Sequence, residues 1–167
     1  MNSGDVAFML IAAAMVLFMT PGLAFFYGGL ERRKNVLNTM MSSLFIMGLA
    51  SAMWVVAGYS LSVGGNSGGF IGALKWFCLN GITFEAGPYS ATIPHLAFVA
   101  FQMMFAIITP ALITGSVAGR MNFKALLIFI ALWSLVVYYP LAHMVWGEGG
   151  LLGSVIGAVD FAGGNVV

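Results

Sequence analysis

The amino-acid sequence predicts an all-α membrane protein, a polytopic bundle of transmembrane helices. Of its 167 residues, 61% are hydrophobic and only 7% are charged, whereas a soluble domain carries about 25% charged residues to keep its surface wetted. Four apolar segments are also long enough to cross a hydrocarbon core of about 30 Å at about 1.5 Å per residue. The net charge of +1 gives no support for nucleic-acid binding.

The first two spans are predicted at residues 6–27 and 36–62. Residues 1–5 lack the basic stretch of a secretory signal, and the first apolar run is longer than a signal core, so we expect it to be a retained helix. Pro21 and Gly22 lie inside this span, where a membrane helix tolerates a kink if its neighbours satisfy the freed backbone groups.

The third and fourth spans are predicted at residues 96–118 and 125–146. The glycine-rich stretch at 64–69 ends the second span, and residues up to about 94 are predicted to form a long extramembrane loop with one short interfacial helix around 71–78. Residues 147–159 are predicted to be a second loop, and a fifth helix is predicted to begin at Asp160. Together these segments form a single transmembrane domain portion over residues 1–167.

The basic residues predict the orientation in the membrane. Five of the six lie in the two loops at 31–34 and 120–124, which face the same side. The positive-inside rule makes that side cytoplasmic. We therefore expect a multi-pass protein of the cell membrane (plasma or inner), with its N-terminus extracytoplasmic.

The sequence contains no constellation typical of an enzyme. His95 and His143 are far apart, and no nucleophile motif, phosphate-binding loop or paired carboxylates accompany them. The single Cys78 excludes an intramolecular disulfide, and no Cys/His pair has metal-ligand spacing. We therefore predict no catalytic residues, no cofactor and no metal site. For His143, a hydrogen-bonded residue that orients the neighbouring loop is favoured over a ligand role.

Aromatic residues and one carboxylate are the candidates for ligand contact. Phe101 and Phe105 share a helix face in the third span, and Trp146 ends the fourth span at the same depth. Aromatic faces attract cations by ~0.5–2 kcal/mol. The alternatives are helix packing for the phenylalanines and an interfacial aromatic belt for Trp146. Asp160 stands where a helix N-cap is needed, and a capping carboxylate can also support a cation site.

Four stretches, taken together, resemble the ammonium transporter family (Amt/Mep/Rh). They are FFYGGLERRKN at 25–35, FQMMFAIIT at 101–109, PLAHMVWG at 140–147 and DFAGG at 160–164. The resemblance implies a fold of about eleven membrane helices, built as two five-helix halves in inverted orientation and assembled as a homotrimer. This chain would be the N-terminal portion, because it ends just before the position of the family's first pore histidine.

The resemblance also implies a set of site residues. Trp146 and Phe105 would form part of an extracytoplasmic vestibule that recruits ammonium, with Phe105 as half of a stacked phenylalanine gate. Phe101 would lie beside the pore, and Asp160 would support the recruitment site. Leu112 and Tyr138 would line the pore. Neither His95 nor His143 stands where the family has its pore histidines, and Gly119-Arg120 replaces an Ala-Glu-Arg-like ending.

The implied function is ammonium transport: the protein would recruit NH4+ (with methylammonium as an analogue), deprotonate it and conduct ammonia through a hydrophobic pore. Implied partners are membrane lipid, two further copies of the chain and a cytoplasmic regulator of the P-II type. One alternative is an ammonium sensor, in which the same fold is fused to a signalling domain. Another is a membrane scaffold fragment without transport.

Overall fold

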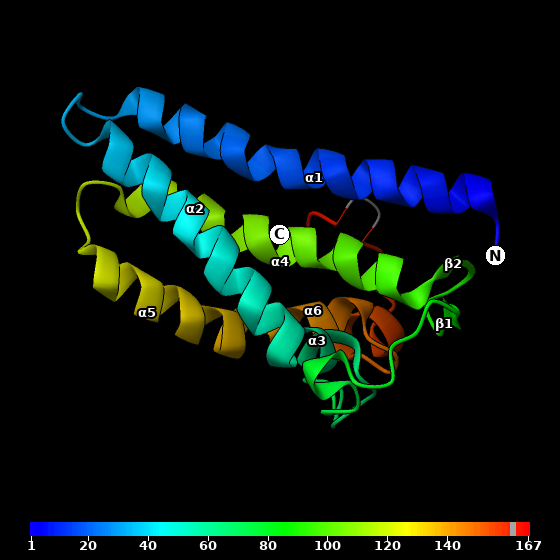
Figure 1. The fold of residues 1–167 in the computed structure, drawn as a ribbon. Coiled ribbons are helices and arrows are strands. Elements are labelled where there is room, and N and C mark those ends of the chain that lie inside the picture. Colours follow the sequence, from blue (N-terminus) through cyan, green and yellow to red (C-terminus); the bar gives the residue numbers. More distant parts are fainter. Residues whose placement is uncertain (161–162) are drawn as a thin grey trace. The chain divides into compact units, whose positions relative to one another are not determined.

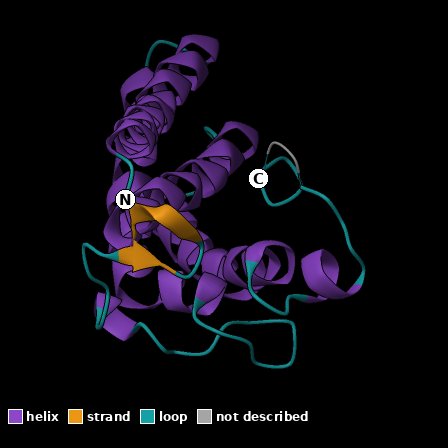
Figure 2. Cartoon of the chain, turned by 90° about the vertical axis from the view of Figure 1, so that its right-hand side faces the viewer, coloured by secondary structure: helices purple, strands orange, loops and turns teal. Residues whose placement is uncertain are grey.

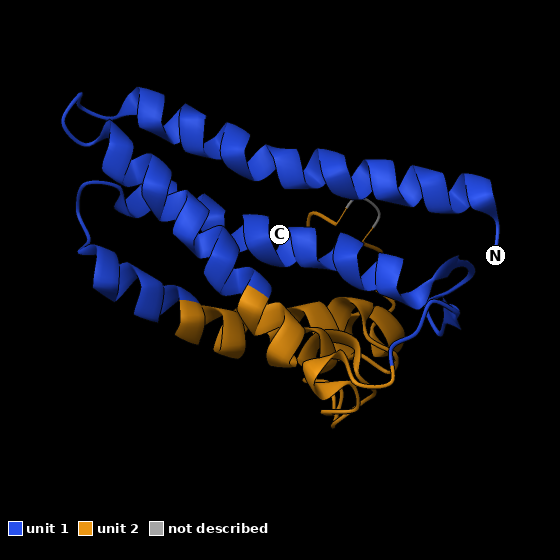
Figure 3. Cartoon of the chain, in the orientation of Figure 1, with its two compact units in different colours: residues 1–51, 82–130 blue, residues 52–81, 131–167 orange. Residues whose placement is uncertain are grey.

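The computed structural model describes residues 1–160 and 163–167 and is dominated by helices (Figure 1). Four helical segments are long and apolar enough to cross a membrane: Ser3–Leu30, Val36–Val63, His95–Val117 and Phe123–Val155. Their residues fall into two compact units, which divide two of these segments part-way along. Residues 1–51 and 82–130 form unit 1, and residues 52–81 and 131–167 form unit 2 (Figure 3).

Unit 1 is built on two long helices that pack along each other, α1 (Ser3–Leu30) and α4 (His95–Val117). Most of α2 (Val36–Met53) and of α5 (Phe123–Trp133) completes it. Pro21 lies inside α1 and Pro110 inside α4, and neither helix ends there. Two clusters of buried side chains form the core, the first of Ala13, Ala50, Met104 and Ile107, the second of Ile46, Ala111, Leu126 and Ile130.

The outer surface of α1 remains apolar, as a lipid-facing helix requires. In the most hydrophobic 18-residue stretch of α1, only 6% of the residues are buried inside the structure. Large side chains such as Phe8, Phe18 and Phe25 are exposed along it. Asn2 caps the helix, because its side-chain oxygen accepts a hydrogen bond of 2.9 Å from the backbone N–H of Gly4.

A short hairpin precedes α4 where the sequence predicted only loop. Strand β1 (Ala86–Gly87) pairs antiparallel with β2 (Ser90–Pro94) through Ala86↔Pro94 and Gly87↔Ser90, with an irregularity between the two pairs. Figure 2 shows these strands beside the N-terminus, where the backbone N–H of Asn2 donates to the carbonyl of Thr92 at 2.8 Å. The pairing is too short to give a period-2 pattern, so the sequence did not reveal it.

Among its described residues, unit 2 contains three π-helices, and two of them join consecutive α-helices. One, Trp54–Gly58, joins α2 to α3 (Tyr59–Val63). The other, Ser134–Tyr138, joins α5 to α6 (Tyr139–Trp146). A π-turn inserts an extra residue into a helix and frequently marks a functional region. Here both turns contribute to a cluster of buried aromatic side chains made of Trp54, Tyr59, Trp76, Tyr138 and Tyr139.

The loops of unit 2 differ from the prediction in two places. Instead of an interfacial helix around 71–78, the structure has a single 3-10 turn, Phe77–Leu79, in which Cys78 and Leu79 take left-handed φ values of 51° and 58°. A third π-turn, Leu151–Val155, lies within the predicted loop at 147–159. Both are single turns, which are too short to give a hydrophobic period.

The fifth helix predicted to begin at Asp160 stays a prediction, because the residues directly after Asp160 lie outside the described part of the chain. Residues 163–166 form a bend and a turn, while residues 161–162 lie outside the described residues. Gly163 takes a left-handed φ of 75° and is followed by a second glycine. The left-handed backbone of Gly163 belongs to this turn, and glycine adopts it without a steric cost.

Gly58 provides a test of the packing in unit 2. A Cβ at this position would lie 2.6 Å from Cζ of the buried Tyr139 ring. We expect Gly58→Ala to destabilise the complete protein by about 1–3 kcal/mol through overpacking, measured as a lower melting temperature in detergent. Gly48→Ala is the matched control, because a Cβ there meets nothing within 4 Å. Equal melting temperatures for the two variants would contradict this account.

Candidate functional site

The residues predicted to bind ammonium or to line the pore are divided between the two units. Phe101, Phe105 and Leu112 belong to unit 1, whereas Tyr138, Trp146 and Asp160 belong to unit 2. Each group is therefore described within its own unit.

Trp146 and Asp160 are joined by a hydrogen bond in unit 2. Trp146 is the last residue of α6, and its indole Nε1–H donates to Oδ2 of Asp160 at 2.9 Å. The other carboxylate oxygen, Oδ1, accepts the backbone N–H of Asn165 at 3.1 Å. Hydrogen bonds to an ionised carboxylate are about twice as strong as neutral ones. Asp160 therefore fixes the orientation of the Trp146 ring and holds the turn at 163–166.

This arrangement refines the capping role expected for Asp160. A helix N-cap accepts from the second or third backbone N–H that follows it, whereas Asp160 accepts from the N–H five residues ahead. The indole N–H is directed at the carboxylate, so the part of Trp146 that can attract a cation is the face of its ring. The carboxylate can orient that face without touching the cation.

Glycines allow the chain to return from Trp146 to Asp160. Gly147 leaves the helix with extended backbone angles. A Cβ on Gly150 would lie 2.4 Å from the carbonyl oxygen of His143, and one on Gly153 would lie 2.2 Å from that of Val145. Residues 150–153 therefore pack directly on the backbone of the last turn of α6. The glycine-rich composition indicated a loop here, but it did not indicate this close approach.

Phe101 and Phe105 lie four residues apart on α4 and contact each other edge to face. Their ring centroids are 5.1 Å apart and their planes make an angle of 76°. Both side chains are half-buried, and Phe101 packs against the core cluster that contains Ala13 and Met104. Phe101 therefore makes packing contacts, and a ligand role stays a prediction for both phenylalanines.

The two residues predicted to line the pore differ in exposure. The Leu112 side chain is 38% exposed, and its carbonyl accepts the Tyr27 hydroxyl at 3.2 Å. Tyr138 is only 1% exposed. Its ring stacks on Trp133 and contacts Tyr139 edge-on, with centroids 6.3 Å and 5.8 Å away. A pore-lining role stays a prediction for both residues.

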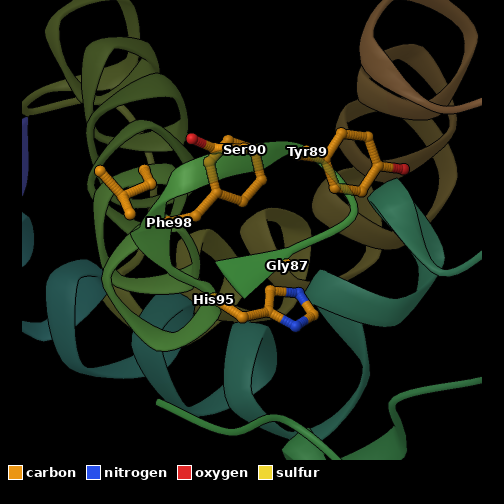
Figure 4. A pocket seen from close by; sticks show the side chains of 6 residues that line it. Gly87, Tyr89, Ser90, His95 and Phe98 are labelled. Carbon is orange, nitrogen blue, oxygen red and sulfur yellow. The ribbon is translucent and has the colours of Figure 1, made fainter. Parts of the chain in front are cut away.

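A small pocket in unit 1 surrounds His95, at the start of α4. Figure 4 shows it between the hairpin and the first turn of the helix. Gly87 lies so close to His95 that a Cβ would be 2.7 Å from the imidazole Cγ. The Tyr89 and Phe98 rings are stacked, with centroids 5.3 Å apart and planes 5° apart. Within residues 1–160 and 163–167, no three His, Cys, Asp or Glu side chains gather into a metal site.

Comparison with known proteins gives one consistent relationship. The model of the Ammonium Transporter Family matches residues 7–167. An ammonium transporter of Bacillus subtilis is 52% identical to this chain, in an alignment that covers all of this chain and 41% of the relative's own length. One from Mycobacterium tuberculosis H37Rv is 42% identical over 99% of the chain and 39% of its own length. The chain thus spans about two fifths of the length of these curated relatives.

Solved structures agree on the fold. The crystal structure of Candida albicans Mep2 superimposes with a TM-score of 0.88 at 35% identity, covering all of this chain and 36% of its own. A structure described as a sensor Amt protein gives a TM-score of 0.88 at 26% identity, covering 98% of this chain and 40% of its own. These matches confirm the predicted all-α membrane fold of the transporter type. The chain is a multi-pass membrane protein, and it belongs to the ammonium transporter family.

Proposed function

We propose that the complete protein transports ammonium across the cell membrane and that Trp146 and Asp160 belong to its recruitment site. The observation that carries this proposal is the 2.9 Å hydrogen bond from the Trp146 indole to the Asp160 carboxylate, found in a chain of the ammonium transporter family. A membrane-edge carboxylate is costly and is retained where it serves a function. Here it holds an aromatic ring in a fixed orientation.

Recruitment follows from the chemistry of the ion. NH4+ is close to K+ in size, so discrimination by size alone is poor. NH4+ can instead donate hydrogen bonds while its charge rests on an aromatic face, and the face proposed here is that of Trp146. Phe105, in unit 1, is proposed separately as a second aromatic residue of the recruitment machinery. Phe101 stands next to Phe105 on the same helix and supports its ring. The site would open to the extracytoplasmic side, where the N-terminus would also lie.

Conduction is proposed to follow deprotonation. Moving a bare cation through an apolar pore is costly, so NH4+ would give up its proton after recruitment. Ammonia would cross, and the proton would be carried separately along the pore. Leu112 and Tyr138 are the residues of this chain proposed to line the pore. The assembly is proposed to be a homotrimer in membrane lipid, with a cytoplasmic P-II-type regulator as a candidate partner.

The test is uptake by the full-length protein in liposomes. We expect saturable, protein-dependent uptake of radiolabelled methylammonium that ammonium inhibits and that Na+ and K+ leave unchanged. Uptake is measured under an imposed pH gradient and again under an imposed voltage, so that both electroneutral and electrogenic transport are detected. Liposomes with correctly assembled protein and no uptake above empty liposomes would favour the scaffold alternative.

The similarity to a sensor Amt protein makes sensing the second candidate function. Relatives described as ammonium transporters share 40–52% identity with this chain, compared with 26% for the sensor, so transport is favoured. A sensor predicts a signalling domain in the complete protein whose activity changes with ammonium while liposome uptake stays at background.

A further inference from the structure

His143 lies one turn before Trp146 in α6, and its side chain is completely buried. Its Nδ1 is 3.1 Å from the carbonyl oxygen of Ser62 in α3. A carbonyl oxygen can only accept a hydrogen bond, so Nδ1 must carry the proton. The neutral ring then has an acceptor at Nε2, and Nε2 has no hydrogen-bond partner within residues 1–160 and 163–167.

The Ser62 carbonyl belongs to the last turn of α3, where a helix leaves carbonyl groups without donors of its own. The neighbouring carbonyls find backbone partners: Ser60 accepts from Gly64 and Leu61 accepts from Gly72, both at 2.7 Å. For Ser62, His143 supplies the donor. The imidazole thus caps the C-terminal end of α3 from a position on α6.

Gly147 fixes the imidazole from the other side. A Cβ on Gly147 would lie 2.4 Å from His143 Nδ1 and 2.7 Å from Cε1. The ring is therefore packed against bare backbone at the first residue after Trp146. Any larger residue at 147 would push the Nδ1 edge of the ring away from its place beside Ser62.

A second connection ties the following turn to the segment after α3. The Asn66 side chain donates from Nδ2 to the carbonyl of Gly149 at 3.1 Å, and its Oδ1 accepts the N–H of Gly69 at 2.6 Å. The N–H of Leu151 donates to the Gly69 carbonyl at 3.0 Å. Trp146 therefore lies between two attachments to the α3 end of unit 2, His143 before it and the turn at 149–151 after it.

We propose that His143 is a positioning residue for Trp146, acting through the Nδ1–H···O=C bond to Ser62. This bond fixes the last turn of α6, so that the indole N–H meets Asp160 and the ring face is presented at a constant angle. The inference rests on the proposed function, because it concerns the recruitment site for ammonium. It assigns no role to Nε2 in proton transfer or in ligand binding.

Two substitutions of His143, each of which replaces a different nitrogen of the imidazole, test the proposal in the full-length protein. An asparagine amide nitrogen falls close to the place of Nδ1, whereas a glutamine amide nitrogen reaches the place of Nε2. We expect His143→Asn to keep the apparent KM for methylammonium uptake close to that of the wild type. We expect His143→Gln to raise it about three- to tenfold, because a misaligned indole loses part of its attraction for the cation.

The opposite ranking, with His143→Gln normal and His143→Asn impaired, would assign the function to Nε2 and overturn the proposal. So would an equal change in both variants. The same comparison is repeated with Trp146→Leu, where His143→Gln should raise KM no further. A further rise there would show that His143 acts on something other than Trp146.

Folding is followed by size-exclusion chromatography and melting temperature. If His143→Gln does not assemble, Gly147→Ala takes its place, because it disturbs the same bond from the backbone side. It should raise the apparent KM in the same range. A wild-type KM for Gly147→Ala would then overturn the proposal.

Uptake by the wild-type protein is measured in parallel. If the wild-type protein shows no uptake, the proposed transport function is refuted, and the bond is assessed by its effect on Trp146 alone. His143→Gln, but not His143→Asn, should then shift the fluorescence emission of the indole, which is identified as the emission that Trp146→Leu removes. An unchanged emission in His143→Gln would refute the positioning role.

Discussion

Asp160→Ala is expected to abolish methylammonium uptake by the complete protein. The substitution removes both acceptors that hold this region, Oδ2 for the Trp146 indole and Oδ1 for the Asn165 backbone N–H. Each lost hydrogen bond to a charged group is worth about 1.5–3 kcal/mol. The indole would lose its orientation and the turn at 163–166 its anchor. Uptake into liposomes is the measurement, and folding and assembly are followed by size-exclusion chromatography.

Two variants make the Asp160 result specific. Asp160→Asn keeps one side-chain oxygen as an acceptor but loses the charge, so we expect reduced uptake, between that of the wild type and that of Asp160→Ala. Asp5→Ala removes a carboxylate from the first turn of α1, in unit 1 and outside the Trp146–Asp160 pair of unit 2, and should leave uptake unchanged. A correctly folded and assembled Asp160→Ala protein with normal uptake would show that this carboxylate is dispensable.

The long helices could be predicted from sequence because a single physical requirement shapes them. A segment that crosses lipid must be apolar over its whole length and satisfy its own backbone, so scarcity of charge is enough to find it. The loops between helices obey no such requirement. The hairpin at 86–94 depends on Gly87 fitting against His95, and the π-turn at Trp54–Gly58 accompanies Gly58 fitting against Tyr139. Contacts of this kind leave no periodic pattern.

For the candidate site, too, contacts within one helix could be predicted from the sequence, whereas contacts between distant segments could not. The four-residue spacing of Phe101 and Phe105 places them on one helix face, and their rings do touch. Trp146 and Asp160 are separated by a glycine-rich stretch, and nothing in its composition determines how far apart its ends lie. Only the resemblance to a family placed them in one site. The role of His143 also depended on a partner, Ser62, that lies 81 residues away in sequence.

Trp146→Leu is expected to raise the apparent KM for methylammonium about two- to thirtyfold and to weaken selectivity for ammonium over Na+. Leucine removes the aromatic face, whose attraction for a cation is worth about 0.5–2 kcal/mol, and it also removes the donor to Asp160. The measurement is the concentration dependence of uptake by the full-length protein, repeated in the presence of competing Na+.

Trp146→Phe separates these two losses, because phenylalanine keeps an aromatic face and lacks the indole N–H. If the ring face recruits the cation, the Phe variant keeps most of the selectivity and falls between wild type and Trp146→Leu in KM. If the bond to Asp160 is what matters, the Phe and Leu variants behave alike, and Trp146 acts by fixing the turn. Unchanged affinity and selectivity in Trp146→Leu would refute both roles and return Trp146 to the interfacial aromatic belt, where its ring serves only to place the helix end at the membrane surface.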